Sequence, residues 1–160
     1  MPELLTSLWP TGFDTRVLPP LVILKAQAGF LPSVTAGIIK ATVETTEGKT
    51  ETEHRLTLVA PAAGGYRHVL VTVSHHNGYV YPAEVRAEPL AETEERRRLS
   101  RPSSTFADQT YTQTTYPSAG SDKELTSLLS TVFNSTYARG IINGLIAKSN
   151  EVAATAAPPA

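Results

Sequence analysis

The chain has no cysteine, one tryptophan and one methionine among its 160 residues. The absence of cysteine excludes disulfide bonds, thiolate metal ligands and a cysteine nucleophile, and it is typical of a cytoplasmic protein. No segment reaches the roughly 18–20 apolar residues of a membrane-spanning helix, and the N-terminus lacks the basic and apolar regions of a signal peptide. We therefore expect a cytoplasmic protein that does not enter a membrane.

The chain also lacks an excess of charge of either sign. Fourteen basic and fifteen acidic residues give a formal net charge of −1, so no overall field attracts nucleic acid. The one concentrated basic feature consists of Arg96, Arg97, Arg98 and Arg101, which directly follow Glu94 and Glu95. An exposed, self-neutralised segment is one interpretation of this feature. Anion or nucleic-acid binding through Arg96–Arg101 is the alternative.

The first apolar run, LVILKAQAGFL, lies between Pro19-Pro20 and Pro32. Proline is favoured in the first turn of a helix and disfavoured later, so this punctuation predicts a short, largely buried helix over about residues 20–31. A buried strand is the alternative, because LVIL alone fits both. Residues 1–18 form an N-terminal arm, in which Trp9 either anchors the arm to the domain or packs locally.

From residue 38 to residue 87 the apolar pattern changes to period two. Turn signals divide this region into four runs, which predicts a four-stranded antiparallel meander with one apolar face. A two-residue turn at Gly48-Lys49, with glycine first, and a three-residue loop at His76-Asn77-Gly78, with glycine left-handed, keep the apolar residues on one face. The expected facing pairs are Ile39–Leu58, Ala41–Leu56 and Val43–His54; Leu58–Val69, Leu56–Val71 and His54–Val73; then Val69–Val85, Val71–Ala83 and Val73–Tyr81. Pro82 cannot donate a ladder hydrogen bond, so the fourth strand is expected at an edge.

This register places His54 and His75 diagonally on one face, with Tyr79 beside His75. Histidine titrates near neutrality and binds metals, so His54, His75 and Tyr79 are the candidate residues of a small metal-dependent or hydrolytic enzyme. The register supplies no carboxylate to complete a metal site or to orient a ring. Histidines at the rim of a core are the competing interpretation, and we expect no metal and no cofactor.

Residues 88–121 are polar and poor in aliphatic side chains, which predicts a linker or loosely packed excursion. A capping-box pattern at residues 121–124 then precedes apolar residues at helical spacing, so residues 122–149 are expected to be helical. Asn134-Ser135-Thr136 interrupts the helical propensity, and either one long helix or a helical hairpin fits. Gly140 and Gly144 suggest close packing against another backbone. Residues 150–160 are expected to be disordered.

Together these patterns predict an α+β domain over residues 19–87. Its apolar sheet face is covered by the N-terminal helix and by one or two C-terminal helices. No serine lies in a nucleophile elbow, and Gly64-Gly65 lacks a phosphate-loop pattern and fits a hairpin turn. The function we expect is a non-enzymatic protein-binding or adaptor module that binds a protein partner or a second copy through its C-terminal helices. The candidate binding residues are Arg96, Arg97, Arg98, Arg101, Leu128, Phe133, Ile141 and Leu145.

Overall fold

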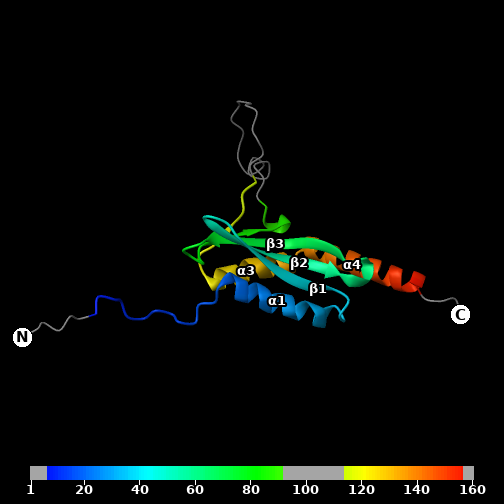
Figure 1. The fold of residues 1–160 in the computed structure, drawn as a ribbon, viewed down its shortest axis with the longest axis horizontal. Coiled ribbons are helices and arrows are strands. Elements are labelled where there is room, and N and C mark those ends of the chain that lie inside the picture. Colours follow the sequence, from blue (N-terminus) through cyan, green and yellow to red (C-terminus); the bar gives the residue numbers. More distant parts are fainter. Residues whose placement is uncertain (1–6, 92–113, 157–160) are drawn as a thin grey trace, which may run out of the picture.

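A computed structural model describes residues 7–91 and 114–156 of the chain. It contains an open, five-stranded antiparallel sheet and three helices, so the fold is α+β (Figure 1). The helices are α1 (Pro20–Val34), α3 (Asp122–Phe133) and α4 (Thr136–Ala156). The strands are β1 (Lys40–Glu47), β2 (Glu51–Ala60), β3 (Tyr66–His76), β4 (Ala83–Arg86) and β5 (Ser118–Ala119), with short 3-10 turns at Pro61–Ala63 and Glu88–Leu90.

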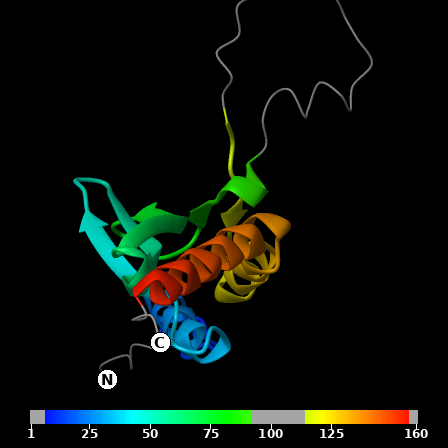
Figure 2. The same cartoon turned by 90° about the vertical axis from the view of Figure 1, so that its right-hand side faces the viewer.

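The three helices lie on the same face of the sheet (Figures 1 and 2). The strands follow one another in chain order from β1 to β5. The core between the two layers is aliphatic; its largest fully buried side chains are Leu24, Ile39, Leu58, Val71, Val73, Val85, Leu125, Leu129 and Val132. Residues 7–18 extend away from this body as an arm (Figure 1).

Helix α1 confirms the predicted helix, and the alternative of a buried strand is wrong. The helix continues past Pro32 to Val34. A proline in the last turn removes only one intrahelical hydrogen bond, and Thr35 closes the helix by donating its N–H to the Leu31 carbonyl at 3.2 Å. The buried side of α1 carries Pro20, Ile23, Leu24 and Ala28.

The sequence largely predicted which face of the sheet is buried. It did not predict many of the residue pairs between neighbouring strands. Val43 lies opposite Leu56 rather than His54, and Ala41 lies opposite Leu58. Gly48 does not adopt a positive φ, so the expected glycine-first turn is absent. Instead Gly48 donates its N–H to the Glu51 carbonyl at 2.7 Å. The shift of two residues keeps every side chain on its expected face.

The pairs His54–Val73 and Leu56–Val71 between β2 and β3 are as predicted. Beyond them an irregularity at Leu56/Thr57 places Val69 opposite Thr57, so the pair Leu58–Val69 is wrong and Val69 is exposed. One strand supplies an extra residue at such a bulge, which turns the following side chains over.

The third connection differs most from the expected register. Val73 lies opposite Val85 and His75 opposite Ala83, a shift of four residues from the predicted pairs. Strand β3 continues through His76, so the three-residue loop is wrong, and Gly78 has no positive φ. Strand β4 is also not an edge, because Ala83 pairs with Ala119 of β5. Pro82 precedes β4 and therefore removes no ladder bond from it.

The C-terminal segment forms two helices. Ser135 divides them: its hydroxyl accepts a hydrogen bond from the Ala138 N–H at 3.1 Å, and its carbonyl accepts from the Arg139 N–H. The predicted cap is formed in part: Glu124 donates its N–H to Ser121 Oγ, while the Glu124 carboxylate accepts from the N–H of Gly120 instead of that of Ser121. Helix α4 continues to Ala156, past residue 150, where we expected disorder.

Two further predictions fall on this part of the chain. A side chain at Gly140 or Gly144 would meet nothing within 4 Å, so these glycines do not mark close packing between described elements. The predicted linker contributes strand β5. Its central part, 92–113, lies outside the described residues, and so do Arg96, Arg97, Arg98 and Arg101.

Candidate functional site

A groove runs between α1 and the C-terminal helices. Its apolar part is a cavity of about 270 Å³ lined by Gln27, Phe30, Leu31, Val34, Ala41, Leu56, Leu58, Leu70, Phe133 and Ile142. A second cavity, of about 330 Å³, shares Gln27 and Phe133 with the first and is lined otherwise by Ile23, Thr126, Leu129, Ser130 and Asn134. We call the two adjoining cavities the α1 groove. It combines an apolar end with a more polar one.

Helix α1 supplies the exposed rim of this groove. Phe30 and Val34 are 61% and 76% exposed, whereas Leu24 and Ala28, on a different side of the helix from Phe30, are buried. Val22 and Ala26 are also exposed, and the four residues are spaced four apart, so they form one stripe along α1. Helix α1 therefore has two apolar sides, of which the body of the protein covers one. The other side is exposed to water, which solvates apolar side chains poorly.

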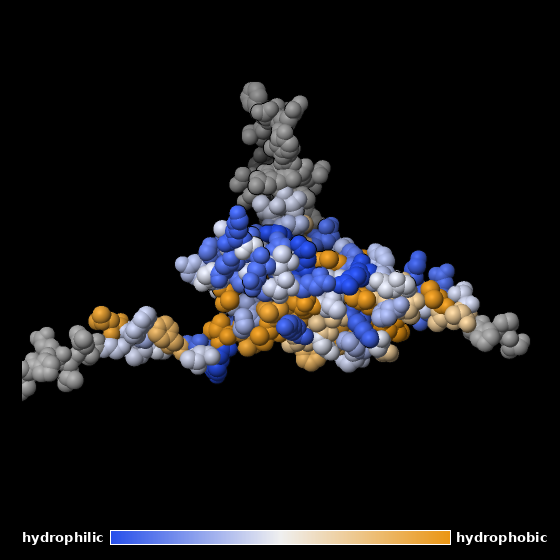
Figure 3. Space-filling view, viewed as in Figure 1, coloured by the Kyte–Doolittle hydropathy of each residue, from blue (hydrophilic) through white to orange (hydrophobic). Residues whose placement is uncertain are grey.

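Figure 3 shows this property on the surface. Hydrophobic residues gather along α1 and on the arm, whereas hydrophilic residues cover the strands and turns above them. Contiguous exposed apolar surface of this kind marks interaction sites more often than isolated apolar residues do.

The structure places the predicted C-terminal binding residues in two settings. Phe133 lines both cavities of the α1 groove. Leu145 is buried in the chain's own core, and Leu128 and Ile141 are partly buried against that core. Of these four residues, predicted from helical spacing to bind a partner, three pack within this chain and only Phe133 lines the groove.

The sheet brings His54 and His75 into direct contact, as the predicted diagonal placement suggested. Their Nε2 atoms lie 3.0 Å apart. The Nδ1 atom of His75 contacts the carbonyl oxygens of His76 and Tyr79, each at 3.0 Å, and therefore carries a proton. His75 Nε2 is then the acceptor of a bond donated by His54 Nε2–H, and Thr45 donates its hydroxyl to His54 Nδ1 at 2.9 Å.

This chain of hydrogen bonds satisfies two neutral histidines. His54 is 4% exposed, and burial, followed by the nearby His75 and Lys25, lowers its pKa below the ordinary value of 6.5. One added proton can be shared if His54 reverses its tautomer, since Thr45 can accept as well as donate. Two added protons would place two N–H groups against each other and break the Nε2 contact.

Tyr79 takes part in this arrangement only through its backbone. Its carbonyl accepts from His75, while its exposed ring lies beside His76 at a centroid distance of 5.5 Å. It does not lie opposite His75 in the sheet, where Ala83 is found. The three predicted catalytic candidates are therefore neighbours, but only the two histidines meet through their side chains.

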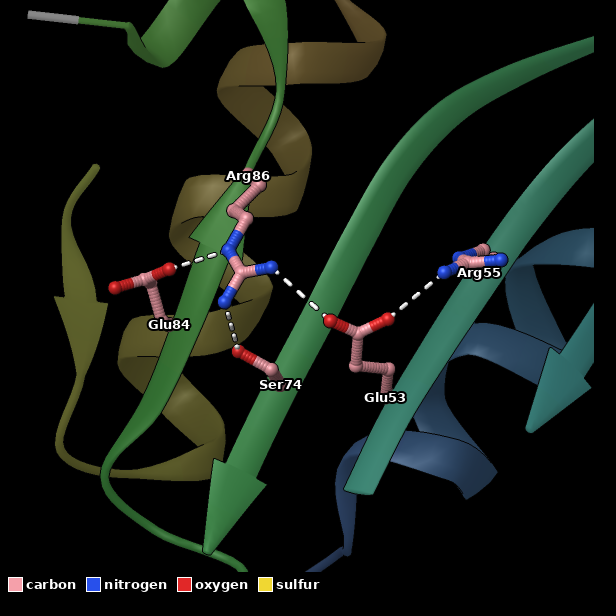
Figure 4. A network of polar contacts seen from close by, with 5 residues as sticks. All are labelled: Glu53, Arg55, Ser74, Glu84 and Arg86. Atoms are coloured by element: carbon pink, nitrogen blue, oxygen red, sulfur yellow. Dashed lines mark hydrogen bonds and ion pairs between the residues drawn. The ribbon is translucent and has the colours of Figure 1, made fainter. Parts of the chain in front are cut away.

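The opposite face of the sheet carries a network of paired charges. Arg86 bonds to Glu84, to Glu53 at 3.1 Å and to Ser74 at 3.3 Å, and Arg55 bonds to Glu53 at 3.0 Å (Figure 4). The hydrogen bond to Glu84, ahead of the bond to Glu53, raises the pKa of Arg86. These arginines already have carboxylate partners, so this face offers little uncompensated positive charge to a phosphate.

Within 7–91 and 114–156, no group of three or more histidines and carboxylates is arranged to hold a metal ion. None of the helices in this part of the chain combines the length and the apolar character needed to cross a bilayer.

The sequence patterns did not identify Phe30 and Val34 as site residues. Phe30 belongs to the apolar run that predicted a largely buried helix, and Val34 lies beyond the predicted end of that helix at about residue 31. Their four-residue spacing from Val22 and Ala26 was the available signal, because it defines a second apolar face beside that of Pro20, Leu24 and Ala28.

Comparison of the chain with protein-family models, with curated proteins and with solved structures finds no match.

Proposed function

We propose that the protein is a non-enzymatic binding module that holds an apolar segment of a protein partner in the α1 groove. The observation that carries this proposal is the exposed apolar rim of the groove, Phe30 and Val34, above a floor of Leu56, Leu58 and Leu70. Covering such surface releases about 25 cal/mol per Å² of apolar area.

The exposed rim of the groove favours a peptide segment over a small ligand. Pockets for small molecules have volumes of about 300–1,000 Å³ and bury most of the surface of their ligand. The apolar cavity, of about 270 Å³, has an exposed rim and continues into a more polar cavity along α1. An extended or helical segment can place one or two large side chains in the first cavity. The second offers Gln27, Ser130 and Asn134 as hydrogen-bonding partners for its backbone.

Nucleic acid is not the proposed partner, because Arg55 and Arg86 are paired with Glu53 and Glu84. The proposed setting is the cytoplasm, which the absence of cysteine supports. The C-terminal helices contribute Phe133 and Ile142 to the groove, in agreement with a partner site that includes them.

Selection of random peptides displayed on phage tests this function. We expect enriched peptides that carry at least two large apolar residues. The double variant Phe30→Ser/Val34→Ser should weaken their binding by about tenfold or more, a loss of at least about 1.4 kcal/mol. The matched control is Val69→Ser, an exposed valine of β3 that does not line the groove, and it should bind as the unaltered chain does. Peptides that bind the double variant equally well would refute the groove as the site.

A second candidate function has one specific observation in its favour, the 3.0 Å contact between His54 and His75. If both Nδ1 atoms donate, to Thr45 and to the two carbonyls, both Nε2 lone pairs converge, as in a metal site whose ligands are oriented by outer hydrogen bonds. A metal-dependent or hydrolytic enzyme would need further ligands and access to the buried His54. Metal analysis after purification in zinc-containing buffer tests it: retention that is lost in both His54→Ala and His75→Ala supports this candidate, and no retention rejects it.

A further inference from the structure

The N-terminal arm exposes its own row of large apolar side chains. Leu8, Trp9 and Phe13 are 97%, 78% and 66% exposed, and Val17 and Leu18 are exposed as well. The only two charged side chains between residues 7 and 18, Asp14 and Arg16, lie 3.4 Å apart, so they neutralise each other. The sequence suggested that Trp9 either anchors the arm to the domain or packs locally. Its exposure shows that it does neither. An unshielded apolar arm of this kind needs a surface to cover it.

The direction in which the arm leaves the body is fixed at its base. Leu18 donates its N–H to the Asp122 carboxylate at 3.2 Å, and its carbonyl accepts from the Tyr81 hydroxyl at 2.7 Å. Burial, with a smaller effect of Asp122, raises the pKa of Tyr81 to about 12, which keeps this hydroxyl a donor. Pro19 and Pro20 follow at once, and their restricted φ angles stiffen the junction with α1. The arm thus points away from α1 (Figure 1), whose residues Phe30 and Val34 line the groove.

We propose that the segment held in the α1 groove is the N-terminal arm of a second copy of this chain, and that two copies exchange arms reciprocally. This inference rests on the proposed function of the groove. Both complementary parts, an apolar extended segment and an apolar groove, belong to one sequence, and neither has a partner within the described part of the molecule. Reciprocal exchange fills both grooves and leaves no free arm, so it gives a closed two-fold dimer rather than a filament.

The same arm could reach its own groove only by reversing at Pro19-Pro20. Val34 lies 14 residues beyond Pro20, or about 21 Å along the helix at 1.5 Å per residue. Trp9 lies nine residues before Leu18, a reach of about 30 Å when fully extended. Length therefore allows a return, whereas the two hydrogen bonds of Leu18 and the prolines oppose the reversal. An experiment must separate the two arrangements.

Because the chain has no cysteine, any disulfide formed in the following test must join the introduced cysteines. Chains that carry only Phe13→Cys are mixed with chains that carry only Val34→Cys and are exposed to a mild oxidant. Arm exchange should yield a covalent heterodimer, at least about tenfold more than a control mixture of Phe13→Cys with Val69→Cys. A yield equal to that of the control overturns the inference. So does a double variant, Leu8→Cys/Val34→Cys, that closes its disulfide within one chain rather than between chains at the same protein concentration, because Leu8 is far enough from Leu18 to return to Val34 when the arm is extended.

The only tryptophan provides an independent readout. Trp9 emission should shift to the blue as the protein concentration rises and the arm enters the groove of a second copy. The double variant Phe30→Ser/Val34→Ser should remain red-shifted and sediment at the mass of one chain. A monomer at all concentrations overturns the exchange. If selected peptides still bind the groove in that case, the binding function stands without it; if they do not, both proposals fail.

Discussion

At the scale of single residues, His54 couples stability to pH. Its pKa in the folded chain lies below the ordinary value of 6.5, with burial as the main cause and the charges of His75 and Lys25 next. The unfolded chain therefore binds more protons than the folded chain below about pH 6.5. The contribution of His54 to the free energy of unfolding is complete above that pH, and it is lost as the pH falls through the lower, folded-state pKa.

Replacement of His54 by an uncharged residue should flatten this dependence. His54→Gln should lose less free energy of unfolding than the unaltered chain when urea unfolding is compared at about pH 7.5 and about pH 5, since one pKa unit corresponds to about 1.4 kcal/mol. His76→Gln is the control, because the exposed His76 ring does not contact His54. An acid loss in His54→Gln as large as in the unaltered chain would contradict the assignment.

Asn77 connects two hairpin ends through its side chain. Its Nδ2 donates to the Gly48 carbonyl at 3.0 Å, and its Oδ1 accepts from the hydroxyl of the buried Thr52 at 2.8 Å. Asn77→Ala should lower the free energy of unfolding by about 1–2 kcal/mol, because two hydrogen bonds are lost and the Thr52 hydroxyl keeps no partner. Asn143→Ala, at an exposed position of α4, should show no loss in the same chemical denaturation. Equal stability of the two variants would exclude this role.

At the scale of elements, α4 carries two glycines without a packing reason. A Cβ at Gly140 or Gly144 meets nothing within 4 Å. Gly140→Ala and Gly144→Ala should each raise the free energy of unfolding by about 0.5–1 kcal/mol, because alanine restricts the unfolded chain and favours the helix. Gly48→Ala should have the opposite sign, since its Cβ would lie 3.0 Å from the Glu51 carbonyl. Thermal unfolding of the three variants checks both signs, and a destabilised Gly144→Ala would reveal a contact of this face.

The faces of the strands could be predicted from the sequence except beyond the bulge in β3, where Val69 is exposed, and most of the register could not. Period two places His54 and His75 on one side of the sheet, and the correctly predicted pair His54–Val73 makes them diagonal neighbours. The errors of two and four residues lie in the β1–β2 and β3–β4 pairings, which do not set this contact. The register depends on the turns, where Gly48 and Gly78 do not use positive φ and where Asn77 bonds across to Gly48. A hydrogen bond between residues so far apart in the chain has no signature in the local sequence, so the turns could not be predicted from it.

The groove was beyond prediction for a related reason. Whether Phe30 is covered depends on how α1 rotates against α3, a helix that begins about a hundred positions later in the chain. The apolar run 21–31 predicts a largely buried helix, whereas the sheet can cover only one side of a helix. The helices themselves were predictable, because Pro19-Pro20 and the Ser121–Glu124 capping box are local signals.

At the scale of the whole molecule, the exposed arm makes stability depend on concentration if arms are exchanged. The midpoint of thermal unfolding of the intact chain should rise with protein concentration, as mass action requires for an associating native state. Removal of residues 1–17 keeps the Leu18 anchor and should give a folded chain with the same circular dichroism. Its midpoint should not depend on concentration. A concentration-independent midpoint of the intact chain would contradict the association.

The anchor at Leu18 also has a mechanical consequence. Leu18 is hydrogen-bonded to Tyr81, just before β4, and to Asp122, the first residue of α3. Tension on the arm is therefore shared among the start of α1, the approach to β4 and the first turn of α3, instead of being carried by α1 alone. When the N-terminus is pulled, the arm straightens without resistance up to Leu18. Beyond that point the force acts on the start of α1, the approach to β4 and the first turn of α3 together, and these segments must separate for the chain to extend further.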